Sequence, residues 1–267
     1  MTLPYFVPGD DPGPDFARLV RRQGTEPFPP AHGASSSDIT HGTTCVAVRY
    51  ADGVVMAGDR RATSGNLISH RSIEKVFAAD RHSAVAIAGA AGPAIEMVRL
   101  FQLQLEHYEK VEGSPLSLEG KANQLGQMIR SNLPAAMSGL AVVPIFAGYD
   151  LARETGRLFE YDITGGRYEE SDYAATGSGS LHAETVIKVG YSRDMSGDQA
   201  VTLLAEALFQ AADADSATGG ADTLRGIFPI VATMSEEGFA RVEDAVVGTK
   251  FAEIAERFAA NHREVQP

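Results

Sequence analysis

The sequence has one cysteine, no long apolar run and no N-terminal secretion signal. Cys45 has no partner for an internal disulfide, and the seven histidines show no paired spacing of the kind that zinc sites use. The longest apolar runs, residues 84–92 and 140–148, are about half the length of a membrane-spanning helix. The first residues have neither the basic region nor the apolar core of a signal peptide. We therefore expect a soluble, cytoplasmic protein without a structural metal or a membrane partner.

Clusters of basic residues are also missing. The formal net charge is −12 at pH 7, whereas a phosphate backbone is bound by clustered lysine and arginine. The stretch Gly177-Ser178-Gly179-Ser180 lacks the lysine of a phosphate-binding loop, and it fits neither GxGxxG nor GxSxG. These absences disfavour nucleic acid and nucleotide as partners, and we expect no cofactor.

The chain divides in composition after Gly42. Seven of its 13 prolines lie in the first 30 residues, and a Gly-Ala-Ser-Ser-Ser stretch follows at residues 33–37. Such a segment cannot bury a core of its own, although Phe16, Leu19 and Val20 could make one short helical turn. Residues 1–42 are therefore interpreted as a leader attached to a domain of residues 43–267.

Pairs of strands alternate with helices in the domain. Asp52-Gly53 between two apolar runs is typical of a hairpin turn, and repeats of three and four residues indicate amphipathic helices. Two strand pairs, each followed by helices, predict an α+β sandwich of four layers, αββα. The expected strands are 44–50, 53–57, 75–79, 83–88, 142–149, 157–163, 227–234 and 238–242. The expected helices are 93–108, 118–133 (ended by Pro134), 182–189, 198–212 (with a capping box at 196–199) and 249–261.

The junction between Gly42 and Thr43 is the most informative local feature. If the chain is cut there, Thr43 acquires a free α-amine beside its hydroxyl, which makes a nucleophile and a base in one residue. That amine has an ordinary pKa of about 7.7–8, and a nearby cation would favour its neutral form. Lys75, with Asp59 as its counter-charge, is a candidate for that cation. The plain alternative is a strand that begins with two threonines, a surface lysine and a solvated strand end.

Six motifs follow one another along the chain: Gly42-Thr43-Thr44, Ala57-Gly58-Asp59-Arg60-Arg61-Ala62-Thr63, Glu74-Lys75-Val76, Ala88-Gly89-Ala90-Ala91-Gly92, Gly177-Ser178-Gly179 and Asp215-Ser216-Ala217-Thr218-Gly219-Gly220. In this order they resemble those of proteasome β subunits, which are N-terminal nucleophile hydrolases. The proline-bearing leader and the form of the last motif are most similar to the bacterial, actinobacterial-type branch. The resemblance spans nearly all of residues 43–267.

The resemblance implies a threonine endopeptidase with the αββα fold. Thr43 would be the nucleophile and, through its amine, the general base. Asp59 would orient Lys75, whose ammonium would lower the pKa of the amine, and the backbone N–H of Gly89 would bind the oxyanion. A hydrogen-bonded network around the amine would comprise Ser178, Asp215 and Thr218, where Thr218 replaces the serine common in the family.

Substrate binding is also implied by the resemblance. Arg61 and Thr63 would lie beside the nucleophile, with the backbone of Thr63 pairing with an extended substrate. The residues of the first specificity pocket are all apolar, which predicts cleavage after hydrophobic residues, as in chymotrypsin-like specificity; ordinary core positions are the alternative. These residues are Ala62, Ile73, Phe77, Ile87, Ala91 and Ile95.

For the whole assembly, the resemblance implies that residues 1–42 are a propeptide removed by self-cleavage between Gly42 and Thr43. Four stacked seven-membered rings, two of β subunits between two of α subunits, would enclose the sites. A ring-shaped ATPase would feed unfolded proteins through the α rings. The alternatives are the two-ring ATP-dependent peptidase of bacteria, whose leader is normally shorter, a small-molecule amidase of the same nucleophile class, and an inactive ring scaffold.

Overall fold

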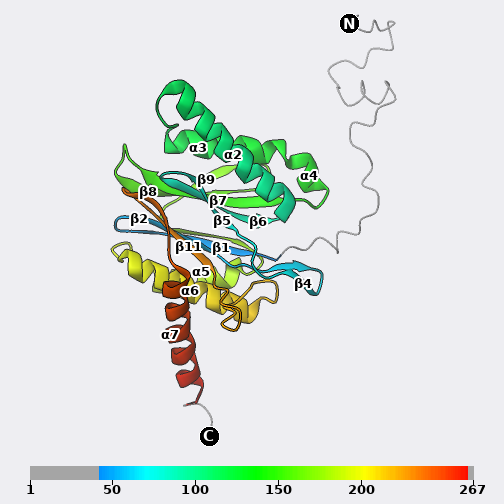
Figure 1. Cartoon of the computed structure of the whole chain (residues 1–267), viewed down its shortest axis with the longest axis vertical. Helices are drawn as coiled ribbons and strands as arrows, with labels where there is room; N and C mark the ends of the chain where they lie inside the picture. Colours follow the sequence, from blue (N-terminus) through cyan, green and yellow to red (C-terminus); the bar gives the residue numbers. More distant parts are fainter. Residues whose placement is uncertain (1–41, 264–267) are drawn as a thin grey trace, which may run out of the picture. The chain divides into compact units, whose positions relative to one another are not determined.

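The computed structural model describes residues 42–263, with side chains up to residue 260 (Figure 1). The leader and the helical turn expected around Phe16 lie outside the described residues. None of the helices in the described range is long and apolar enough to cross a membrane.

The first sheet has five antiparallel strands in the order β10-β1-β2-β11-β12. Its central hairpin, β1–β2, turns at Ala51-Asp52, which confirms the predicted hairpin. The strand bounds are β1 Thr44–Tyr50, β2 Gly53–Gly58, β10 Tyr173–Gly177, β11 Ile230–Ser235 and β12 Gly238–Arg241.

The second sheet is also antiparallel, in the order β5-β6-β7-β8-β9. Its strands follow one another along the chain, so each forms a hydrogen-bonded ladder with its sequence neighbour. The strand bounds are β5 Val76–Asp80, β6 Ser83–Gly89, β7 Val142–Asp150, β8 Thr155–Tyr161 and β9 Arg167–Glu170. A separate short hairpin, β3 Ala62–Ser64 with β4 Leu67–His70, lies between the first and second strand pairs in sequence.

Helices cover the outer face of each sheet (Figure 1). The second sheet carries α2 Ala91–Glu112, α3 Leu118–Ser131 and α4 Leu133–Met137. The first carries α5 Ser180–Gly190 and α6 Gly197–Ala214, and α7 Asp244–Arg263 packs against α6. The predicted capping box is present at the start of α6, where Ser196 and Gln199 bond reciprocally. The predicted four-layer α+β sandwich is confirmed.

Alternation along β1 shows how the core is divided between the layers. Val46 and Val48 pack with α5 and α6, whereas Cys45 and Ala47 pack in the cluster between the two sheets. Cys45 is fully buried, and this burial raises the pKa of its thiol to about 12. The prediction that Cys45 is a core residue is therefore confirmed. Strands buried on both faces explain why these runs are continuously apolar.

Several elements differ from the sequence prediction. The hairpin β3–β4 and the edge strand β9 were not predicted because they are short and carry polar or exposed residues instead of an apolar alternation. Strand β10 was also missed. Helix α3 ends at Ser131, and Pro134 lies in the first turn of α4, where its missing N–H costs nothing. Helix α7 begins at Asp244, five residues before the expected start.

Candidate active site

The junction between Gly42 and Thr43 lies at the start of β1. Thr43 is buried, and the register of the hairpin pairs Cys45 with Gly58 at the end of β2. The residue after Gly58 therefore returns to the start of β1. This topology places Asp59 beside Thr44, whose backbone N–H donates to Asp59 Oδ1 at 2.8 Å.

The carboxylate of Asp59 is fully buried and accepts four hydrogen bonds. Oδ1 receives the Thr44 N–H and the ammonium of Lys75 at 2.6 Å. Oδ2 receives the N–H groups of Arg61 and Gly219, both at 2.8 Å. An ionised carboxyl group offers about four acceptor positions, so this buried charge is fully satisfied and held in one orientation.

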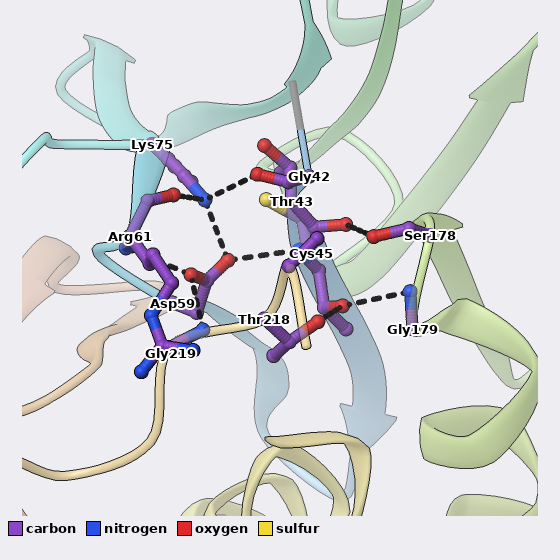
Figure 2. Close-up of polar contacts among 12 residues, drawn as sticks. Gly42, Thr43, Cys45, Asp59, Arg61, Lys75, Ser178, Gly179, Thr218 and Gly219 are labelled. Atoms are coloured by element: carbon purple, nitrogen blue, oxygen red, sulfur yellow. Dashed lines mark hydrogen bonds and ion pairs between the residues drawn. The ribbon is translucent and has the colours of Figure 1, made fainter. Parts of the chain in front are cut away.

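The ammonium of Lys75 uses its three donors inside the same site (Figure 2). Its side chain is 5% exposed, and Nζ donates to Asp59 Oδ1 and to the carbonyl oxygen of Arg61, each at 2.6 Å. The third contact, at 3.4 Å, is with the carbonyl oxygen of Gly42. The predicted Asp59–Lys75 pair thus exists and points at the peptide bond before Thr43.

The second group of predicted residues lies on the other side of Thr43. Asp215 follows α6, and its Oδ2 accepts from Ser178 Oγ at 2.5 Å and from Thr218 Oγ1 at 2.6 Å. Burial raises the pKa of Asp215, but bonds from Ser178, Thr218 and the Ala217 N–H outweigh it and hold that pKa below its ordinary value. Ser178 Oγ also lies 3.5 Å from the carbonyl oxygen of Thr43. The three predicted residues therefore form one network around a charged carboxylate.

A small hollow adjoins Thr43. Gly89, at the end of β6, lines it with φ +113°, a conformation that favours glycine, and an added Cβ would overlap the Ala141 carbonyl. Five of the six predicted pocket residues line this hollow, and the sixth, Phe77, packs against the hydrophobic cluster beneath α2 that also includes Ile87 and Ile95. The lining residues predicted from sequence are Ala62, Ile73, Ile87, Ala91 and Ile95; those not predicted are Glu74 and Ala94.

Gly42 lies beside β3. The backbone N–H of Gly42 donates to Thr63 Oγ1 at 3.2 Å. Arg61 Nη1 donates to the carbonyl oxygen of Ser216 at 3.0 Å, which links this side of the site to the loop after α6. Of the two residues predicted to contact substrate, Thr63 therefore contacts Gly42, and Arg61 contacts Lys75 through its carbonyl oxygen.

Three residues of the site had no role assigned from the sequence: Thr44, Gly179 and Gly219. Gly219 donates to Asp59, and Gly179 donates its N–H to Thr44 Oγ1 at 3.1 Å. All three lie inside the sequence motifs. Thr44 could have been noticed from the sequence because it is a polar residue directly before an apolar run. Among the described residues, no group of acidic, histidine or cysteine side chains could hold a metal ion.

Comparison with known proteins gives a consistent result. A family model described as proteasome subunit matches residues 39–225. A proteasome subunit beta of Acidimicrobium ferrooxidans is 58% identical over 92% of this chain and 90% of its own. Those of Streptomyces griseus and Jonesia denitrificans are 58% and 50% identical, covering 90% and 96% of this chain and 86% of each relative.

These names favour a proteasome over the two-ring peptidase, the amidase and the inactive scaffold. The chain belongs to the proteasome subunit family, in which it is a bacterial-type catalytic β subunit and a threonine protease.

Proposed function

We propose that this chain is made as a precursor, cuts itself between Gly42 and Thr43, and then hydrolyses unfolded proteins with Thr43 as its N-terminal nucleophile. One observation carries the proposal: the ammonium of Lys75, held by the buried Asp59, lies 3.4 Å from the carbonyl oxygen of Gly42. A cation at that oxygen stabilises the negative charge that develops when the carbonyl is attacked.

Self-cleavage needs no group from outside the site except water. The hydroxyl of Thr43 attacks the carbonyl carbon of Gly42, its proton passes to the leaving nitrogen, and the peptide bond becomes an ester. Water then hydrolyses the ester, which frees the leader as an acid and leaves Thr43 with an α-amine. A side chain at residue 42 would overlap Ala217 in the present backbone, so glycine fits the junction.

In the mature chain the new amine takes over as the base. It accepts the proton of the Thr43 hydroxyl while the hydroxyl oxygen attacks a substrate carbonyl. The resulting oxyanion accepts a hydrogen bond from the backbone N–H of Gly89. The ammonium of Lys75 disfavours protonation of the amine, because two like charges at close range repel. The amine product leaves with the proton, and water hydrolyses the resulting ester to release the acid product.

The wall of the hollow supports a preference for hydrophobic residues before the cleaved bond. Ile95 lies on α2 at this wall and is partly exposed, and it also packs against the core cluster beneath α2. We expect Ile95→Asp to lower kcat/KM for a peptide with leucine at that position by about 100-fold. The Ile95→Asp variant should cleave a peptide with arginine in place of that leucine faster than the wild type does. Leu100→Asp, on the exposed face of the same helix, is the control. An equal loss for both peptides would argue against a specificity pocket here.

The assembly is proposed from the same family. The β subunits would form two seven-membered rings between two α rings in the cytoplasm, with the sites inside and an ATPase ring docked on the α ring. Family membership supports assembly with other proteasome subunits, and the finer arrangement is part of the proposal.

The test of the proposed function uses the purified αβ complex. Intact mass should show a β chain that begins at Thr43. The complex should also cleave a fluorogenic tripeptide amide with a hydrophobic last residue much faster than β alone. An active complex whose β chain still begins at Met1 would contradict the proposal.

A further inference from the structure

Thr44 joins the two sides of the site. It is fully buried and opens β1. Its backbone N–H donates to Asp59 Oδ1 at 2.8 Å, and its carbonyl oxygen accepts the N–H of Asp59 at 3.1 Å. The main chain of Thr44 is thus fixed on the side of Asp59 and Lys75.

The hydroxyl of Thr44 reaches the opposite side. It lies 2.5 Å from Thr218 Oγ1 and accepts the backbone N–H of Gly179 at 3.1 Å. The proton of each hydroxyl can be placed, because the ionised Asp215 only accepts. Thr218 therefore donates to Asp215, and Thr44 must donate to Thr218. The bonds run in one direction, from Gly179 through Thr44 and Thr218 to Asp215, and such chains strengthen each member.

The backbone around Gly179 is built for this contact. An added Cβ at Gly179 would overlap both Thr44 Oγ1 and Thr218 Oγ1. The loop can therefore bring its N–H to the hydroxyl of Thr44 only with glycine at this position. This close approach is independent of the hydrogen bonds to Thr218 and supports the same arrangement.

We propose that Thr44 is a positioning residue for the peptidase reaction: its hydroxyl connects Gly179 to the Thr218–Asp215 network and so fixes Thr43 between that network and the Asp59–Lys75 pair. The inference rests on the proposed role of Thr43 as nucleophile. Removal of the hydroxyl leaves the buried N–H of Gly179 without its acceptor and Thr218 without its donor. Thr43, which is joined to Thr44 by one peptide bond, then loses its fixed orientation toward the substrate carbonyl.

The test compares Thr44→Val and Thr44→Ser in the αβ complex. The valine keeps the shape and removes the hydroxyl, and we expect kcat to fall about tenfold, the equivalent of one hydrogen bond. KM should stay within about twofold, because Thr63 and the hollow are not altered. Thr44→Ser should keep most of the wild-type kcat. The matched control is Thr176→Val on β10, another buried threonine, whose hydroxyl donates to the Val143 carbonyl at 3.3 Å; its kcat should not change.

A double variant and the nucleophile variant separate the outcomes. If Thr44 acts through Thr218, adding Thr44→Val to Thr218→Val should cost little further activity, because residues of one network are not additive. Wild-type kcat in Thr44→Val, or a loss equal to that of Thr176→Val, would overturn the inference. Should Thr44→Val not assemble, Thr44→Ala is used with the same expectation. An active Thr43→Ala variant would contradict the proposed function. An inactive Thr43→Ala variant together with a fully active Thr44→Val variant would contradict only the role proposed for Thr44.

Discussion

Thr43→Ala is expected to abolish self-cleavage and peptidase activity together. Alanine removes the hydroxyl that we propose attacks the Gly42 carbonyl in the precursor and the substrate carbonyl in the mature chain. The β chain should remain at full length, and the rate of tripeptide hydrolysis should fall by at least about 10⁴-fold, as when other hydrolases lose their nucleophile. Intact mass and a fluorogenic assay on the assembled αβ complex measure the two effects.

Two further variants complete this experiment. Thr43→Ser keeps a hydroxyl and, once cleaved, an amine, so it should process itself and retain activity well above that of the alanine variant. The Thr43→Ala chain made without its leader, so that it begins with the substituted residue, should also be inactive, which excludes failure of processing as the cause. A full-length Thr43→Ala chain with wild-type hydrolysis would mean that another residue is the nucleophile.

The elements that could be predicted are those with strong local signals. The hairpins β1–β2 and β5–β6 are apolar runs joined by short turns, and their bounds agree with the prediction to within one residue. The hairpin β3–β4 could not be found this way, because every residue of β4 is exposed and no apolar face marks it. Its existence depends on the chain on either side of it, and a single-sequence pattern does not contain that information.

The site shows the same division between local and distant information. The hairpin register explains the approach of Asp59 to Thr44, a separation of 15 residues. The contacts of Thr218 with Thr44 and of Gly219 with Asp59 span 174 and 160 residues, so only the resemblance could indicate that this loop belongs to the site. Phe77 packs against the same hydrophobic cluster as Ile87 and Ile95, which line the hollow, so its assignment to the pocket stays a prediction.

Lys75→Met is expected to stop self-cleavage and to lower hydrolysis by at least about 10³-fold, the order attributed to one strong oxyanion-stabilising donor. The change also removes the partner of the buried Asp59, which typically costs about 3–5 kcal/mol of folding stability. A loss of activity could therefore arise from unfolding alone. The chain offers a matched control in Lys121, whose Nζ pairs with Asp80 at 2.5 Å and whose side chain is 7% exposed.

Lys121→Met should lower the thermal unfolding midpoint by an amount similar to Lys75→Met, about 2–4 °C for each kcal/mol in a domain of this size. Because Lys121 lies on α3 and its partner Asp80 on β5, its variant should still begin at Thr43 and keep the wild-type kcat per assembled complex. The decisive comparison is between the two lysine variants below both unfolding midpoints, because each leaves a buried carboxylate without its cation and only Lys75 lies at the carbonyl of Gly42. If both variants lost cleavage and activity equally, Lys75 would have only a structural role; if Lys75→Met alone remained folded but uncleaved and inactive, the ammonium itself is required at the carbonyl of Gly42.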